Sequence, residues 1–251
     1  MKNDRSLAQP HDVLVALALL SRLPVQVQDW SRQARAVWAY PLVGVVLGGV
    51  ASVAGLMALG LGLPAPLVAL ITLAVLIPLS GAMHEDGLAD TADGFWGGWD
   101  AKQRLHIMKD SHIGTYGVVA LCLSLATRWA ALWILWDMGG SVAVPAILTS
   151  AILSRAVMPI LMAGLPHARD MGLSHSVGQV GWSGAILGVA LAMGLALALQ
   201  GFVAIWAGFW AALVLFGIAL MARSKIHGQT GDVLGASQQI TEVTILICLL
   251  A

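Results

Sequence analysis

The chain has 251 residues, of which 59% are hydrophobic and 10% are charged, whereas about a quarter of the residues are charged in an ordinary soluble domain. This composition excludes a water-soluble globule. Thirteen Lys and Arg residues balance thirteen Asp and Glu residues, so the chain has no strongly basic surface, and nucleic acid is excluded as a partner.

At about 20 apolar residues for each crossing of a lipid bilayer, the chain forms about six or seven membrane-spanning helices. We therefore expect an all-α, multi-pass integral membrane protein with one membrane-embedded domain, residues 1–251. The first apolar run, Val13 to Leu20, is too short to cross a bilayer. It ends at Arg22 and Pro24 without the cleavage site of a signal peptide, which predicts an interfacial or re-entrant helix.

The stretch from Ala36 to Met83 contains no charged residue. Gly and Pro residues break it in the middle, which predicts a transmembrane hairpin of Leu42–Leu59 and Leu67–Met83. The later predicted spans are Gly117–Trp136, Val142–Ala163, Trp182–Leu199, Phe202–Met221 and a short seventh span that ends at Ala251. Three polar segments, residues 84–116, 164–181 and 222–239, are predicted to be loops.

Positive charge is distributed unevenly along the chain. Eleven of the thirteen Lys and Arg residues lie in the N-terminal segment and the three polar segments. By the positive-inside rule, these segments face the cytoplasm, as expected for a multi-pass protein of the inner membrane. The other two, Arg128 and Arg155, lie within predicted spans, where a charge is costly and marks a functional candidate. The alternative is a structural role, such as pairing with an intramembrane carbonyl or a nearby Asp.

The densest group of ionisable residues is the segment from His84 to Gly94. On a helix, at about 100° per residue, Asp90 lies roughly 40° to one side of Asp86 and Asp93 roughly 20° to the other. Three like charges on one face repel one another unless they are protonated, solvated or bridged by a cation. A hard cation, Mg²⁺ before Mn²⁺, fits these oxygen ligands. The alternative is a solvated acidic loop beside a helix N-terminus.

The residues that follow this acidic segment are rich in cations and hydrogen-bond donors: Lys102, Arg104, His106, Lys109, Asp110, Ser111 and His112. Carboxylates that hold Mg²⁺ beside such groups suit phosphoryl transfer from a diphosphate, whereas an acidic loop without basic neighbours would favour calcium storage. The Gly-containing segment from Asp110 to Gly117 could bind phosphate through its backbone N–H groups. A comparable polar segment, residues 227–236, carries Thr230 and Asp232. The alternative interpretation of this segment is a connecting loop without a binding role.

Five motifs in order along the chain resemble the adenosylcobinamide-GDP ribazoletransferase (cobalamin synthase) family. They begin at Ser21 (SRLPV), Tyr40 (YPLVG), His84 (HEDGLADTADG), Met108 (MKDSHIGTYG) and Thr230 (TGDVLGA). The resemblance implies an integral membrane enzyme that uses Mg²⁺. It also implies substrates: adenosylcobinamide-GDP and α-ribazole or its 5′-phosphate are joined to give adenosylcobalamin or its 5′-phosphate, and GMP is released.

The resemblance also implies roles for particular residues. A ribazole hydroxyl would attack the phosphorus nearer the cobinamide, with Mg²⁺ on Asp86, Asp90 and Asp93 neutralising the diphosphate. Among the candidate catalytic carboxylates, Glu85 or Asp110 would be a further metal ligand or accept the hydroxyl proton, and Asp232 would bind a second metal or act as the base. The candidate substrate-binding residues are His84, Arg104, Lys109, His112, Thr230 and Arg155. The chain departs from the family pattern at His227-Gly228, where the family tends to have Gly-Gly, and at Gln239, where it tends to have Glu.

Two other functions fit the sequence less well. A phosphatidyltransferase that acts on a CDP-alcohol also uses carboxylates at a membrane edge, but its Asp-Gly-x-x-Ala-Arg run is not met, because Leu88, Ala89 and Asp90 follow Asp86-Gly87. A secondary transporter would place its carboxylates near the bilayer midplane, whereas these acids gather at one predicted edge.

Overall fold

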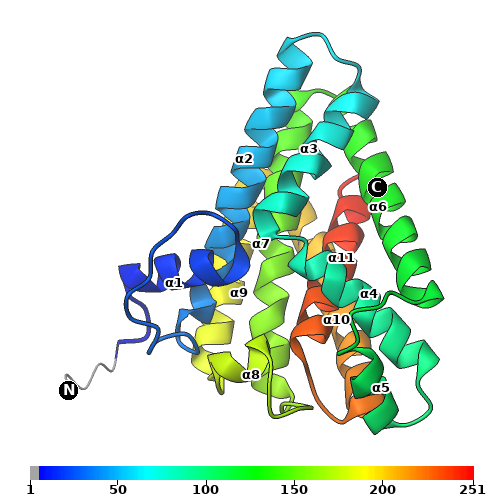
Figure 1. The fold of residues 1–251 in the computed structure, drawn as a ribbon. Helices are drawn as coiled ribbons and strands as arrows, with labels where there is room; N and C mark the ends of the chain where they lie inside the picture. The colour runs from blue at the N-terminus through cyan, green and yellow to red at the C-terminus, as the bar shows by residue number, and fades with distance from the viewer. Residues whose placement is uncertain (1–5) are drawn as a thin grey trace.

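The computed structural model describes residues 6–251, and no strand occurs in that range apart from a single bridge between His167 and Gln229 (Figure 1). The helices are α1 (Pro10–Leu20), η1 (Ala36–Ala39), α2 (Tyr40–Gly60), α3 (Ala65–Ser80), α4 (Met83–Gly97), α5 (Ala101–Ile107), α6 (Thr115–Asp137), α7 (Gly140–Gly164), α8 (Leu173–Val177), α9 (Trp182–Gln200), α10 (Val203–Ile226) and α11 (Gly231–Cys248). The predicted all-α class is confirmed.

Five helical segments are long and apolar enough to cross a membrane: Ala36–Gly60, α6, α7, α9 and α10. A sixth crossing is present if α3 and α4, which meet at an angle of 84°, form one broken span. The chain is therefore a multi-pass membrane protein. Helix α7 lies at the centre of the bundle, since 83% of its most apolar window is buried by the other helices.

The predicted seventh span is not among these segments. The final apolar run is the second half of α11, which begins at Gly231 and carries Asp232 and Glu242. These polar residues lower its hydropathy, and the structure buries Glu242 inside the protein rather than in lipid. Helix α11 is therefore a core helix packed among α4, α6, α7 and α10.

The predicted polar loops are also largely helical. Residues 84–97 belong to α4, 222–226 to α10 and 231–239 to α11. One tertiary contact and one local cap contribute to the difference: an ion pair binds Glu85 of α4 to α6, and the Thr230 hydroxyl caps α11 by accepting a hydrogen bond from Val233 N. Sequence composition alone cannot reveal such partners.

The short N-terminal helix predicted at Val13–Leu20 is present as α1, extended to Pro10. Its Asp12 carboxylate is buried and accepts hydrogen bonds from Arg32 at 2.7 and 2.9 Å and from the Trp38 indole at 2.8 Å. These bonds hold α1 against the segment that precedes α2. With 11 residues, or about 16 Å of helix, α1 is too short to span a bilayer.

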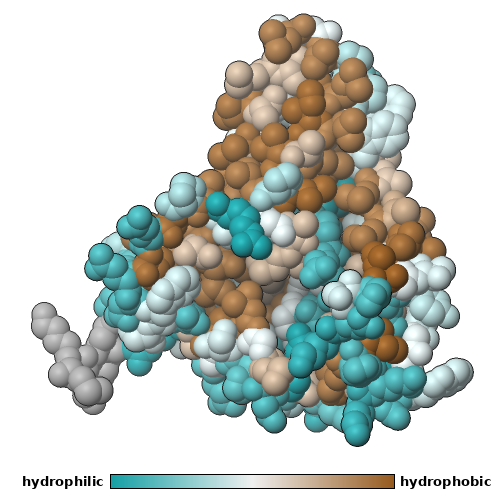
Figure 2. Space-filling model, viewed as in Figure 1, coloured by the Kyte–Doolittle hydropathy of each residue, from teal (hydrophilic) through white to brown (hydrophobic). Residues whose placement is uncertain are grey.

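A sharp turn separates the apolar α3 from the acidic α4. Gly81 (φ 70°) and Ala82 (φ 54°) both adopt the left-handed conformation, which ends α3 and turns α4 away from it. Hydrophobic side chains cover the end of the molecule formed by α2 and α3, whereas hydrophilic ones gather at the opposite end, over α5 and the region of α8 (Figure 2). Helix α4 is too rich in carboxylates to lie in hydrocarbon and runs toward the hydrophilic end.

Candidate active site

The site begins where α4 crosses α11, and two glycines allow this close crossing. A Cβ atom on Gly87 would lie 2.7 Å from the Asp232 carbonyl oxygen and 3.1 Å from the Gly235 Cα atom. A Cβ atom on Gly235 would lie 3.2 Å from the His84 Cα atom. The crossing therefore brings Asp232, from the last polar segment, beside the acidic face of α4.

Three carboxylates from these two helices interact electrostatically. Asp86 is exposed and Asp90 is half-buried. Burial, followed by the charges of Asp86, Asp232 and Asp93, raises the pKa of Asp90 to about 7. Burial also raises the pKa of Asp232, while Arg169 opposes this shift. We call Asp86, Asp90 and Asp232 the acidic group.

Arg169 is the cation that faces the acidic group. Its Nη2 atom donates to Asp232 Oδ2 at 2.9 Å, and both side chains are about four-fifths buried, with 21% and 17% of their surfaces exposed. The hydroxyl of Thr230 also donates to Asp232 Oδ2, at 3.3 Å. Thr230, predicted to bind substrate, is 2% exposed and acts as the N-cap of α11.

Asp93, the third predicted metal ligand, lies on α4 but turns toward the N-terminus of α6. Its Oδ2 atom accepts from Gly114 N at 2.7 Å and its Oδ1 atom accepts from Gly117 N at 2.9 Å. Asp93 thus satisfies backbone donors that a helix N-terminus leaves free. Within residues 6–251, no three His, Cys, Asp or Glu side chains are already arranged to hold a metal ion.

Glu85 belongs to a buried cluster rather than to the acidic group. Arg128 of α6 forms ion pairs with Glu85 at 2.8 Å and with Glu242 of α11 at 2.9 Å. The same guanidinium donates to Gln239 Oε1 at 3.0 Å. Glu85 is 7% exposed and its carboxylate is paired with Arg128, so the predicted catalytic role of Glu85 finds no support in this position.

Arg155 and His84 were both predicted to bind substrate, but each has at most 2% of its surface exposed. Arg155 Nη1 donates to the Ala151 carbonyl at 3.0 Å, which matches the structural alternative for this intramembrane cation. His84 lies in a cavity of about 40 Å³ lined by apolar side chains and the start of α11, and its Nε2 atom has no hydrogen-bond partner. The structure gives neither residue access to a diphosphate.

The cationic segment after α4 lines an open cleft of about 640 Å³. The basic side chains at its wall are Lys102, His106, Lys109 and Arg169, together with the acids Asp100 and Asp170. This volume is in the range of small-molecule sites, about 300–1,000 Å³. Lys109 is exposed at this cleft, as a predicted phosphate ligand should be.

Arg104, the other predicted phosphate ligand of this segment, has a structural position. Its Nε atom donates to the Gly98 carbonyl at 3.1 Å and its Nη1 atom to the Lys225 carbonyl at 3.0 Å. It therefore ties α5 to the end of α10.

Asp110 and His112 form an exposed pair, with Oδ1 and Nδ1 2.7 Å apart. The hydrogen bond between them lowers the pKa of Asp110 and raises the pKa of His112. They line a second open pocket, of about 300 Å³, beside Asp93 and Tyr116. The pair is accessible, so both residues remain candidates for contact with substrate.

The sequence did not indicate that four further residues take part in the polar contacts of the protein: Arg169, Gln238, Gln239 and Glu242. Glu242 and Gln239 carried a usable signal, because they lie three residues apart on α11, which places both on one face. Arg169 carried no such signal, since a single Arg in a polar segment is common.

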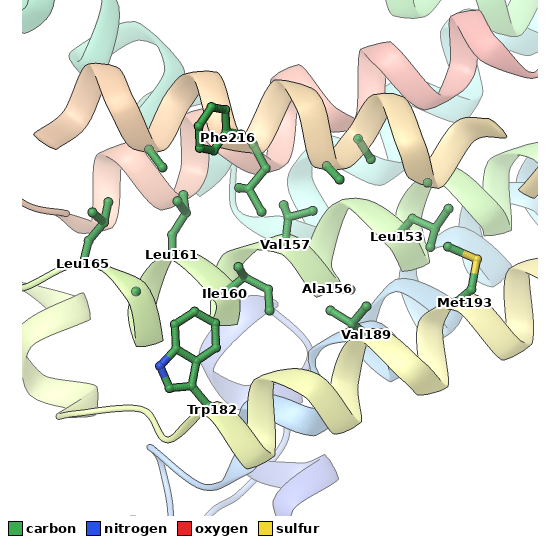
Figure 3. A pocket seen from close by; sticks show the side chains of 16 residues that line it. Leu153, Ala156, Val157, Ile160, Leu161, Leu165, Trp182, Val189, Met193 and Phe216 are labelled. Atoms are coloured by element: carbon green, nitrogen blue, oxygen red, sulfur yellow. The ribbon is translucent and has the colours of Figure 1, made fainter. Parts of the chain in front are cut away.

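A separate groove of about 480 Å³ runs between α7, α9 and α10 (Figure 3). The side chains that point into it are apolar, among them Leu161, Val157, Val189 and Phe216. With no charged group in its lining, this groove cannot position a diphosphate, and the acidic group with its adjacent cleft remains the candidate active site.

Comparisons with known proteins identify the family of the chain. The model of the family described as Cobalamin-5-phosphate synthase matches residues 12–250. A protein of Brucella ovis named adenosylcobinamide-GDP ribazoletransferase is 41% identical over 254 aligned positions, which cover 94% of this chain and 95% of the relative. A protein of the same name from Brucella anthropi is 39% identical over 250 positions, covering 94% of each chain. No solved structure matches the chain. The chain belongs to the adenosylcobinamide-GDP ribazoletransferase (cobalamin synthase) family.

Proposed function

We propose that this chain joins adenosylcobinamide-GDP to α-ribazole, or to its 5′-phosphate, and releases GMP. The relatives that carry this name align with 94% of the chain. The single observation that carries the proposal at the level of the site is the position of the acidic group beside a cleft lined by Lys102, Lys109 and Arg169. A carboxylate-bound cation and adjacent basic side chains are the two elements that a diphosphate requires.

We assign the cation, Mg²⁺ with Mn²⁺ as a substitute, to Asp86, Asp90 and Asp232. Hard carboxylate oxygens suit these ions. Burial and then repulsion by the neighbouring carboxylates raise the pKa of Asp90, and a divalent charge would offset that repulsion. Asp93 is left out, because both of its oxygens already accept backbone hydrogen bonds. When bound, Mg²⁺ supplies the charge that neutralises the diphosphate and the departing GMP.

The chain's own residues bind the phosphates and accept a proton. Lys102 and Lys109 are placed to contact the diphosphate from the wall of the cleft. The proton of the attacking ribazole hydroxyl goes to Asp110, the accessible candidate among the predicted catalytic carboxylates that is not assigned to the cation. Glu85 is excluded from this role in the proposal, because Arg128 holds it.

We further propose that the protein lies in the inner membrane with the acidic group on the cytoplasmic side. The supporting pattern is that Lys and Arg residues gather in the N-terminal segment and in residues 84–116, 164–181 and 222–239. Figure 2 is consistent with this, since hydrophilic side chains collect at the end of the molecule that holds α5.

The direct test uses the purified protein in detergent with Mg²⁺, adenosylcobinamide-GDP and α-ribazole. Formation of adenosylcobalamin and GMP is expected, with loss of product in EDTA and in the Asp86→Asn and Asp90→Asn variants. Full activity of these variants, or of the wild type in EDTA, contradicts the metal assignment. Release of CMP from a CDP-alcohol in a parallel reaction would instead support the phosphatidyltransferase alternative.

A further inference from the structure

We propose that Arg169 is a phosphate-binding residue, which pairs with Asp232 and transfers to the diphosphate of adenosylcobinamide-GDP when a divalent cation takes its place on that carboxylate. The inference rests on the proposed function, because it requires a cation at the acidic group. It assigns to a residue outside the five family motifs a direct contact with the substrate.

The position of Arg169 is the first argument. Its guanidinium lies 2.9 Å from Asp232 Oδ2, at one edge of the acidic group. The same side chain lines the cleft of about 640 Å³ that also holds Lys102, His106 and Lys109. Arg169 therefore contacts both the proposed cation site and the proposed phosphate site.

Charge competition is the second argument. The hydrogen bond to Asp232 engages Nη2, whereas a guanidinium has five N–H donors in a planar fork that suits phosphate oxygens. A divalent cation on Asp232 would repel the guanidinium and satisfy the carboxylate. In the cleft, which also holds Asp100 and Asp170, the substrate's diphosphate would then be the most highly charged anion available to the guanidinium.

A purely structural role for the ion pair is the alternative, and the surrounding contacts weigh against it. The loop that carries Arg169 is already joined to the start of α11 by two backbone hydrogen bonds, Ala168 N to Gln229 O at 2.9 Å and Gln229 N to Pro166 O at 2.8 Å. The Ser174 hydroxyl donates to Gln229 Oε1 at 2.6 Å and adds a third connection. The loop therefore does not depend on Arg169 for its position.

The test compares cation and nucleotide binding by the full chain in detergent, without turnover. In Arg169→Ala, Mn²⁺ binding followed by electron paramagnetic resonance should tighten by about two- to fivefold, because a competing cation is removed. GDP binding in the presence of Mg²⁺, followed by equilibrium dialysis, should weaken by about tenfold or more, because charge-assisted hydrogen bonds to phosphate are lost. Arg169→Lys should recover part of the GDP affinity.

Arg223→Ala is the matched control, since Arg223 is an exposed Arg in the last turn of α10 and should leave both affinities unchanged. Opposite shifts in Mn²⁺ and GDP affinity support the proposal, because loss of a structural contact would weaken both. An unchanged GDP affinity, or a parallel loss of both affinities, overturns it.

The Asp86→Asn variant separates this inference from the proposed function. If that variant loses Mn²⁺ binding while Arg169→Ala keeps wild-type GDP affinity, the metal site stands and only the role of Arg169 is wrong. If Asp86→Asn keeps wild-type Mn²⁺ affinity, the metal site is wrong and the role of Arg169 is wrong with it.

Discussion

At the scale of single residues, the four carboxylates of α4 lie within nine positions of one another yet have three different surroundings. Glu85 pairs with Arg128 in the protein interior. Asp93 binds the backbone amides that begin α6. Only Asp86 and Asp90 face Asp232. The environment, and not the residue type, therefore separates structural carboxylates from candidate ligands.

The two roles predict different consequences for two similar substitutions. Asp93→Ala should lower the free energy of unfolding by about 1–3 kcal/mol, because two backbone N–H groups lose their acceptor. Asp86→Ala should change stability by less than about 0.5 kcal/mol, because the Asp86 side chain is exposed, but should abolish cation binding. Thermal unfolding in detergent with EDTA distinguishes them, and equal losses of stability would contradict the assignment.

The pKa of Asp90 predicts how pH acts on stability. Its folded value, about 7, is above the ordinary value of 3.8, so its contribution to stability is complete below about pH 4 and is lost as the pH rises through about 7. Because Mg²⁺ binds the ionised carboxylate, its stabilising effect should grow over the same rise in pH.

Melting temperatures measured from about pH 5 to about pH 8, with EDTA and with Mg²⁺, check this expectation. The difference between the two series should widen with pH in the wild type. It should be small at every pH in Asp90→Asn, and a wild-type difference that narrows with pH would be the contrary result.

The buried cluster around Arg128 predicts a larger loss of stability. Arg128→Met leaves the carboxylates of Glu85 and Glu242 without their cation in the interior, which should cost about 3–5 kcal/mol. The triple variant Arg128→Met, Glu85→Gln, Glu242→Gln removes all three charges and should recover much of that loss. Urea unfolding in detergent measures both, and equal stability of the two variants would be incompatible with this account.

At the scale of helices, the active site depends on the crossing of α4 and α11. Gly87 and Gly235 lie at this crossing, and a Cβ on either meets backbone atoms of the other helix at 2.7–3.3 Å. Backbone atoms cannot move aside as a flexible side chain can. The distance between Asp86 and Asp232 is therefore set by the absence of side chains at these two positions.

Gly87→Ala should accordingly separate the two helices and reduce product formation at least tenfold, by misplacing Asp232 by a fraction of an ångström or more. Gly49→Ala is the control, since no atom lies within 4 Å of a Cβ at this position of α2. It should keep full activity and stabilise the protein by up to about 1 kcal/mol, because alanine favours helix more than glycine does. Wild-type activity of Gly87→Ala would be evidence against the crossing as the determinant of the site.

At the scale of the whole molecule, charge is distributed unevenly between the two ends. The connections Leu61–Pro64, between α2 and α3, and Gly201–Phe202, between α9 and α10, carry no charge, whereas the cleft beside α5 is lined by charged side chains. This asymmetry is what a substrate that enters from one aqueous compartment requires.

The predicted orientation can be measured with reporter fusions. A fusion at Gln103, in α5, should report a cytoplasmic position, and fusions at Gly62 and Gly201 should report the opposite side. A periplasmic signal at Gln103 would invert the topology and place the acidic group outside the cell.

The sequence by itself determined the membrane class, the helical architecture, the short helix α1 and the acidic segment, because these depend on local composition and on the length of apolar runs. It also placed Asp86, Asp90, Asp232 and Lys109 among the candidates, through the charge that surrounds them. Local sequence could not show that the last helix is a core helix, because that depends on partners more than 80 residues away, such as Ser154 for Gln238.

Only the tertiary structure decided which ionisable residues can reach a substrate. His84, Arg155 and Glu85 are ionisable in the printed sequence, but the packing of the helices buries them, and Arg128 of α6 pairs with Glu85. Arg169 is a candidate only because of the fold, which brings its guanidinium within 2.9 Å of the Asp232 carboxylate although the two residues are 63 positions apart in the chain. Composition and periodicity are properties of a segment, whereas burial and ion pairing depend on segments that are distant in sequence, and this is why the site needed the fold.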